Sequence, residues 1–182
     1  MKQQFRIFAV AAVVLTVAGC SRRGNPVAPS GEDFPPDSKF SVTLYSPSSS
    51  VSNGESFEVR VVLYNVSNVF GAAVEVSYPA AMVEVLGVTG GITFFPPDSV
   101  ISLSKIESDS GRVDYAVTFK NAASGKSKSG SGIVCTLMCR ANATGTASFA
   151  INRKTLQIST PGGTLINGFA DLLIEDLSMN IR

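Results

Sequence analysis

The sequence predicts an all-β protein built as a β-sandwich. From Phe40 onward, apolar and polar residues alternate with a period of two, which is typical of strands with one buried face. Turn residues interrupt this alternation about every eight to twelve positions, as in sandwich folds. No convincing helical period extends beyond about two turns.

The first segment, residues 1–19, is typical of a signal peptide. Lys2 and Arg6 form a basic start, and the apolar run that follows is too short to span a bilayer. The run ends in Val17-Ala18-Gly19-Cys20, which resembles the lipobox of bacterial lipoproteins. The resemblance implies acylation of Cys20 after cleavage before it, and therefore a lipid-anchored protein of the cell envelope, at the outer membrane or cell surface. An ordinary signal peptide with an incidental cysteine, or an uncleaved anchor, is the alternative.

Residues 20–39 are predicted to be a disordered tether that begins at the lipidated Cys20. Ser21 to Lys39 contains four prolines and two glycines and few residues that could form a core. The remaining residues, 40–182, are enough for one domain with a hydrophobic core.

Two strands show the alternation most clearly. Their inward side chains are predicted to be Phe57, Val59, Val61 and Leu63 in one strand and Val113, Tyr115, Val117 and Phe119 in the other. The other predicted strands cover residues 41–45, 69–78, 83–88, 100–106, 133–141, 146–151, 155–158 and 172–181. Turns are predicted at residues 52–55, 109–111 and 161–163, and residues 79–82 are predicted to form one short helical turn.

Composition excludes several classes of chemistry. The chain has no histidine, so it has neither a Ser-His-Asp triad nor a histidine zinc site. Without residues 1–19 it has 13 basic and 14 acidic residues, and nucleic acid is not an expected partner. We expect no enzymatic activity, catalytic residue, cofactor or metal site. Cys135 and Cys139 lie on one face of a predicted strand, too far apart to bond to each other, and we expect both to be buried.

The order of three segments resembles the cohesin domain, a receptor module of cellulosome-type assemblies. The segments are Ser56 to Val66, Val69 to Val88, and Gly130 to Leu137 with Ala141 to Thr146. The resemblance covers nearly all of residues 40–181. It implies a jelly-roll-like antiparallel β-sandwich of about nine strands, related to some carbohydrate-binding modules. Cohesins bind dockerins, which are small calcium-loaded helical modules.

The resemblance also implies where a partner docks. In cohesins of cellulose-degrading clostridia, outward Asn and Asp side chains on one strand contact the dockerin, and the matching positions here are Gly71 and Ala73. The predicted partner-binding face contains these two residues with Glu75, beside Asp114, Ala116 and Thr118. The expected function is a non-catalytic envelope module that docks a dockerin-type or other protein partner, linked to polysaccharide degradation or surface assembly.

Polysaccharide binding by the sandwich is the alternative function. Glycan platforms need exposed aromatic rings, and the chain has no tryptophan. The candidates are Tyr45, Tyr64 and above all the loop with Phe94 and Phe95, whose rings could instead plug the end of the sandwich.

The acidic residues around the predicted turn at residues 109–111 could form a calcium site. Glu107, Asp109 and Asp114 flank a predicted hairpin, but calcium takes about six to eight oxygen ligands. A solvated turn is the simpler interpretation of these three carboxylates.

Replacement of the lipobox cysteine tests the predicted anchor. Cys20→Ala should leave an unprocessed precursor and abolish metabolic labelling by fatty acid, because the acylated thiol is gone. Labelling and immunoblotting measure both effects. A variant that is still labelled and still cut before residue 20 would contradict the lipoprotein interpretation.

Overall fold

The computed structural model describes residues 37, 39–121, 125–166 and 172–182. All of them belong to one compact unit of the chain. The predicted signal peptide, Cys20 and most of the predicted tether lie outside the described residues. Among the described residues, no helix is long and apolar enough to cross a membrane.

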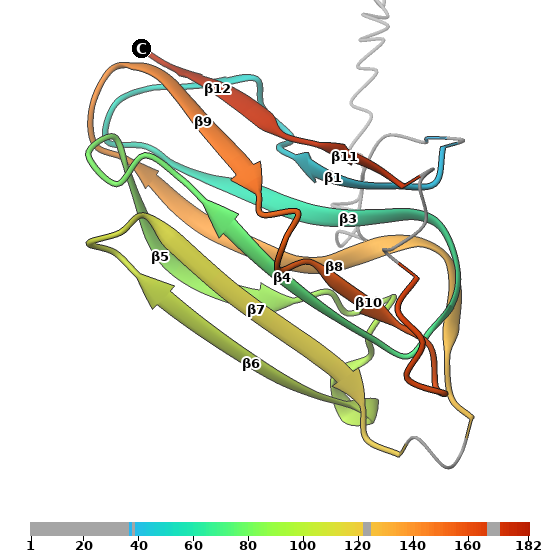
Figure 1. The fold of residues 1–182 in the computed structure, drawn as a ribbon. Coiled ribbons are helices and arrows are strands. Elements are labelled where there is room, and N and C mark those ends of the chain that lie inside the picture. Colours follow the sequence, from blue (N-terminus) through green and yellow to red (C-terminus); the bar gives the residue numbers. More distant parts are fainter. Residues whose placement is uncertain (1–36, 38, 122–124, 167–171) are drawn as a thin grey trace, which may run out of the picture. The chain divides into compact units, whose positions relative to one another are not determined.

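Two β-sheets form the fold (Figure 1). The five-stranded sheet has the order β11-β1-β3-β8-β5, with β11 Leu173–Glu175, β1 Ser41–Tyr45, β3 Ser56–Val69, β8 Lys128–Ala141 and β5 Val83–Gly90. The other has the order β2-β12-β9-β4-β7-β6, with β2 Ser50–Val51, β12 Leu177–Ile181, β9 Gly145–Ile151, β4 Gly71–Ser77, β7 Arg112–Phe119 and β6 Val100–Glu107. Its seventh strand, β10 (Gln157–Ser159), pairs with β4, and a short 3-10 turn covers Pro97–Ser99.

The all-β sandwich is confirmed, with three corrections to its strands. Both sheets are mixed, because β1 pairs with β11 and β12 pairs with β2 in parallel. The strand count is also higher than predicted, because very short strands such as β2 add to it. The predicted strand over residues 172–181 is two strands separated at Asp176, whose carboxylate accepts a hydrogen bond from the backbone N–H of Ile151 (2.9 Å).

The three predicted turns are present. Gly54, Gly111 and Gly163 have positive φ angles of 87°, 62° and 80°, which glycine adopts without steric cost. The short helical turn predicted at residues 79–82, after β4, is also present. The backbone N–H of Val83 closes it by donating to the carbonyl oxygen of Pro79 (3.0 Å).

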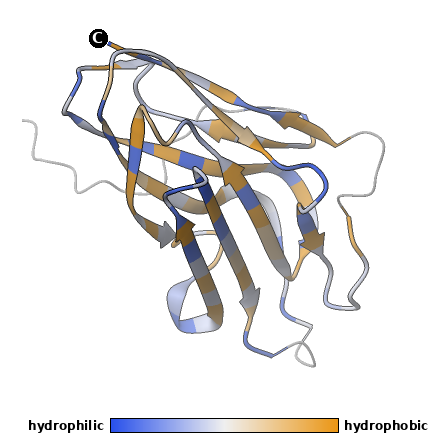
Figure 2. Cartoon of the chain, turned by 60° about the vertical axis from the view of Figure 1, so that its left-hand side comes forward, coloured by the Kyte–Doolittle hydropathy of each residue, from blue (hydrophilic) through white to orange (hydrophobic). Residues whose placement is uncertain are grey.

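The core lies between the sheets and follows the predicted alternation. Phe57, Val113 and the other residues predicted to point inward on their two strands are buried, and Figure 2 shows the alternating hydropathy along the strands. Phe149 lies at the centre of one aromatic group, edge-on to Phe57 at 6.2 Å and stacked with Tyr78 at 6.5 Å between ring centroids. Such pairs add to the stabilisation from burial by about 0.5 to 1.5 kcal/mol each.

A second, smaller cluster lies on the five-stranded sheet. It contains Val62, Tyr64 and Ile133, with Tyr45 packed against it. Tyr64 is only 3% exposed, and burial raises the pKa of its hydroxyl. The suggestion that Tyr64 could serve as an exposed glycan platform is therefore wrong.

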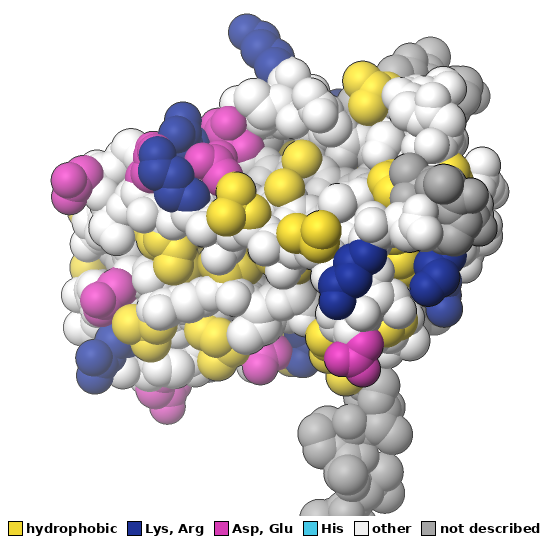
Figure 3. Space-filling model, turned by 90° about the horizontal axis from the view of Figure 1, so that it is seen from below, with side chains coloured by type: hydrophobic (Ala, Val, Ile, Leu, Met, Phe, Trp, Pro, Cys, Tyr) yellow, Lys and Arg dark blue, Asp and Glu magenta, His cyan; other side chains and the backbone are white. Residues whose placement is uncertain are grey.

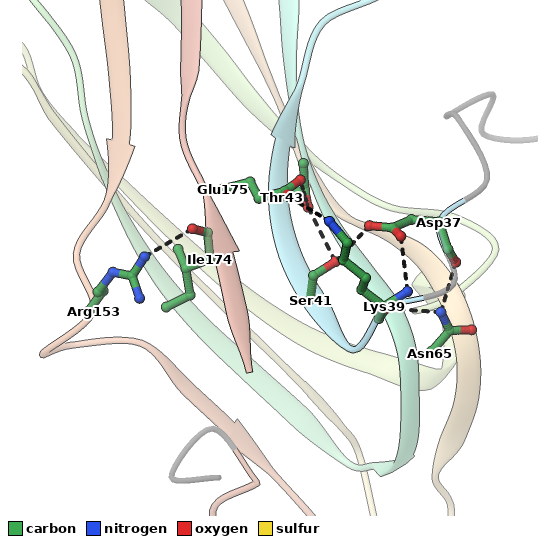
Figure 4. A network of polar contacts seen from close by, with 8 residues as sticks. All are labelled: Asp37, Lys39, Ser41, Thr43, Asn65, Arg153, Ile174 and Glu175. Carbon is green, nitrogen blue, oxygen red and sulfur yellow. Dashed lines mark hydrogen bonds and ion pairs between the residues drawn. The ribbon is translucent and has the colours of Figure 1, made fainter. Parts of the chain in front are cut away.

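The end of the predicted tether contacts this sheet (Figure 4). The side-chain amide of Asn65 on β3 donates to the carbonyl oxygens of Asp37 (2.8 Å) and Lys39 (2.9 Å). The Lys39 ammonium lies 3.8 Å from a carboxylate oxygen of Glu175 on β11. Contacts with the sandwich therefore begin at least three residues before Phe40, the predicted start of the domain, because polar side chains of β3 and β11 bind the approaching chain.

Cys135 and Cys139 are both free and fully buried on β8. Burial disfavours the thiolate, so it raises the pKa of Cys139 to about 12 and that of Cys135 further above its ordinary value.

Thiol reactivity tests this burial. The native protein at pH 8 should leave Cys135 and Cys139 unmodified by a disulfide reagent, because both thiols are protonated and inaccessible. Both should react once the protein is denatured in urea, which is the control. Rapid modification of the two thiols in the folded protein, followed by mass spectrometry, would show that the inward direction assigned to them on β8 is wrong.

Candidate functional site

The six residues of the predicted partner-binding face lie together on one surface. The strand pairing sets Gly71 opposite Thr118, Ala73 opposite Ala116 and Glu75 opposite Asp114. All six share the outer side of β4 and β7, because their neighbours in each strand, such as Val74 and Tyr115, are buried in the core. The residues were predicted from two separate segments, and the antiparallel register makes them three adjacent pairs.

This surface is the floor of a groove. The groove measures about 400 Å³ around Gly71, Ala73 and Ala116. A second hollow of about 290 Å³ continues it past Glu75 and Asp114. Small side chains on the floor leave the backbone of β4 and β7 close to the surface, so a partner can approach closely.

Two neighbouring strands supply the sides of the groove. On β6, Ile101 lies opposite Thr118 and Leu103 lies opposite Ala116, and their side chains are 60% and 74% exposed. On the far side, β10 places Gln157 beside Ala73. Figure 3 shows the molecule from below, with several hydrophobic side chains (yellow) exposed near the middle of this face.

The sequence alone did not indicate the residues at the sides of the groove. Segment 100–106 has apolar residues at both even and odd positions, so its alternation does not show which face is buried. The predicted turn at residues 109–111 determines which face of this segment is buried, because it sets the register between β6 and β7. It pairs Ile106 with buried Val113, and this register turns Ile101 and Leu103 outward.

One end of the groove is charged. The Glu107 carboxylate is hydrogen-bonded by the Lys105 ammonium and also lies 2.7 Å from the Arg112 guanidinium. These two cations lower the pKa of the Glu107 carboxyl, and the hydrogen bond from Lys105 is the larger cause. Arg112 also lies 3.5 Å from Asp114. Figure 3 shows acidic and basic side chains gathered toward its upper left.

Glu75 is held by a different partner. Its carboxylate accepts a hydrogen bond from the side-chain amide of Asn152 (2.9 Å), and its backbone carbonyl accepts one from the Asn152 N–H (2.9 Å). Glu75 therefore has a defined position directly opposite Asp114. Two carboxylates facing each other make this end of the groove attractive to a cationic group.

The carboxylates considered for calcium do not assemble into a metal site. Glu107 and Asp114 are engaged with Lys105 and Arg112. Among the residues that the structure describes, no group of three or more His, Cys, Asp or Glu side chains is placed to hold a metal ion.

Phe94 and Phe95 do not form an exposed platform. Each is 1% exposed, and their rings pack edge-on with centroids 5.0 Å apart. Phe95 also packs against Phe119 at 5.6 Å. The suggestion of a glycan platform on this loop is wrong, because the two rings complete the core at one end of the sandwich.

A glycine explains how Phe94 fits there. A Cβ atom at Gly132 on β8 would lie 2.6 Å from the Phe94 ring, which is closer than packed atoms approach. The absence of a side chain at position 132 therefore makes room for the aromatic ring.

Known proteins provide an independent comparison. A family model described as cohesin domain matches residues 40–165, more than half of the chain. No curated protein matches the chain.

Several solved structures share the fold. A type II cohesin domain from the cellulosome of Acetivibrio cellulolyticus has a TM-score of 0.68 at 12% identity, covering 78% of this chain and 95% of that chain. A type II cohesin-X-dockerin complex from the same organism gives 0.67 at 12% identity, covering 78% and 98%. A non-cellulosomal cohesin from the archaeon Archaeoglobus fulgidus gives 0.61 at 15% identity, covering 78% and 91%.

The burial of Phe94 predicts an effect on stability. Phe94→Ala should lower the free energy of unfolding by about 3 to 5 kcal/mol, because it leaves a cavity in the core. Chemical denaturation measures this change. Ile92→Ala is a matched control, because Ile92 is 60% exposed and should change stability by less than about 0.5 kcal/mol. An equally small loss for Phe94→Ala would contradict the core position.

Proposed function

The chain belongs to the cohesin family, and we propose that it is a non-catalytic docking module that binds a dockerin-type protein partner in its outer groove. The observation that carries the proposal is the groove itself. Its floor of small residues on β4 and β7 lies between exposed Ile101 and Leu103 on β6 and the polar strand β10. An exposed apolar surface of this kind is typical of protein-binding sites.

The dimensions of the groove suit a helix. Strands β6, β7, β4 and β10 are neighbours in that order, and adjacent strands lie about 4.8 Å apart. The sides are therefore about 14 Å apart, and a helix with its side chains is about 10 to 12 Å wide. A helix along the strands could place apolar residues against Ala73, Ala116 and Leu103.

Charge suggests how such a helix is oriented. Glu75 and Asp114 face each other at one end of the groove, and Asp114 shares its cation, Arg112, with Glu107. A lysine or arginine on the partner would be attracted to this end, and apolar residues to the other. Long-range attraction of this kind favours one orientation of the partner over its reverse.

The predicted lipid anchor is part of the proposal. We propose that Cys20 attaches the chain to a membrane of the cell envelope and that residues 21–36 connect it to the domain. The chain reaches the sandwich at Asp37 and Lys39, against β3 and β11 of the five-stranded sheet. The groove belongs to the other sheet, so the point of attachment does not occupy it. A partner carried by polysaccharide-degrading or surface proteins could then dock at the cell surface.

Direct polysaccharide binding has less support. The described aromatic side chains that were candidates for a platform are buried or packed on the five-stranded sheet. The outer groove is lined mainly by aliphatic, small and polar residues, and Phe70 is the one aromatic residue among those that line its main part.

A charge placed on the groove floor tests the proposal. Ala73→Arg should weaken binding of purified calcium-loaded dockerin modules by about tenfold or more, because it inserts an unpaired charge into a desolvated interface. Thr89→Arg is the matched control, because Thr89 is exposed on β5 of the five-stranded sheet, and it should bind normally. Isothermal titration calorimetry measures the affinity of both variants for the dockerin modules. The titrations are repeated with a chelator, which removes the calcium of the partner.

Two results would contradict the proposal. One is dockerin binding that Ala73→Arg leaves unchanged. The other is a chain that binds no member of the dockerin panel but sediments with insoluble polysaccharide, whether or not Ala73 is replaced.

A further inference from the structure

The edge strands of the two sheets differ in how well they could pair with another strand. The five-stranded sheet ends at β11 and β5, and the larger sheet ends at β2 and β6. Strand β10 pairs with β4 on one side, and on the other side its Ser159 forms an isolated bridge with Leu165. Strands β2, β10 and β11 contain two or three residues. Short edges of this kind offer few backbone groups.

Of the two longer edges, only β6 is regular. The pairing of β5 with β8 shifts between Val85 and Gly87, and a bulge of this kind disturbs an edge. By contrast, β6 pairs with β7 over eight consecutive residues without a shift. It contains no proline, and none of the described residues pairs with its other side.

On β6, polar side chains lie on the core side and apolar side chains lie on the outer side, the reverse of an ordinary strand in a sandwich. Ser102 and Ser104 share the core side with Val117 and Tyr115 of β7, yet both serines are exposed. Ile101 and Leu103 point outward and are largely exposed. A solitary edge strand gains nothing from this arrangement, because its apolar side chains remain in water.

We propose that β6 pairs antiparallel with β6 of a second copy of this chain, joining the two larger sheets into one. The strand is complementary to itself in one register. With Leu103 opposite Leu103 of the second copy, Val100 lies opposite Ile106, and Ser102 lies opposite Ser104. Ile101 then lies beside the aliphatic stem of Lys105. The pairs made by Leu103, by Val100 with Ile106 and by Ser102 with Ser104 join residues of similar character, as stable cross-strand pairs do.

This pairing closes on itself. A two-fold axis through the Leu103 pair uses the β6 edge of both copies, and the opposite edge of the larger sheet is β2 with two residues. The assembly therefore stops at a dimer. The contact between two eight-residue strands is small, and we expect association at high protein concentration. The two outer grooves would then lie on one continuous sheet.

Sedimentation measures the association directly. The full chain in density-matched detergent should show a concentration-dependent dimer. Leu103→Lys should raise the dimer dissociation constant by about tenfold or more, because it sets two ammonium groups directly opposite each other. Leu103 is 74% exposed, so the fold does not depend on it. Leu86→Lys on β5, where Leu86 is 53% exposed, is the matched control and should dimerise like the wild type.

Cross-linking tests the register. Directly opposite residues in antiparallel strands have Cα atoms about 4.5 to 5.5 Å apart, a separation that a disulfide can span. Leu103→Cys should therefore form an intermolecular disulfide under mild oxidation, and Leu86→Cys should not. Any product formed through Cys20 would appear equally in both variants.

The results decide between clear alternatives. A chain that stays monomeric at the highest concentration, a dimer that Leu103→Lys leaves intact, or equal cross-linking of the two cysteine variants would overturn the β6 pairing. Dimerisation is measured without any partner, and Ala73→Arg, on β4, should preserve it. The dimer and the docking function can therefore fail independently.

Discussion

Alternation along the strands is the constraint on which the rest of this structure depends. A side chain in the core sends its two neighbours to the opposite face, so Val74 and Val76 determine where Ala73 and Glu75 point. The same holds on β7, where the inward side chains of Tyr115 and Val117 send Asp114, Ala116 and Thr118 to the outer face. Packing of the core therefore also builds the floor of the groove, and a shift of one residue in either strand would destroy both.

The shape of the groove depends on two kinds of side chain, small ones on its floor and larger apolar ones at one side. Small residues on β4 and β7 keep its floor low, and larger apolar residues on β6 raise one side. Ile101 and Leu103 contribute nothing to the core, since their side chains are mostly in solvent. Under the two proposals, a docked partner would contact them in the groove, and a second copy would contact them along the edge of β6.

The two sheets have different roles. The five-stranded sheet receives the incoming chain, where Asn65 holds the backbone of Asp37 and Lys39. The larger sheet presents the groove and the regular edge strand β6. The contacts with Asp37 and Lys39 therefore leave the outer face of β4 and β7 unobstructed.

The sequence by itself determined the turns, most of the strands and the inward faces of the most regular strands, because these follow from local alternation and from glycines with positive φ angles. It also identified the cohesin family and the six outward residues of β4 and β7. Tertiary structure decided what depends on neighbours distant in the chain. It paired β1 with β11 in parallel, turned Leu103 outward through the register with β7, and buried Phe94 and Phe95. Phe94 fits into the core because Gly132, far along the chain, leaves space for its ring, and no local pattern could reveal that space.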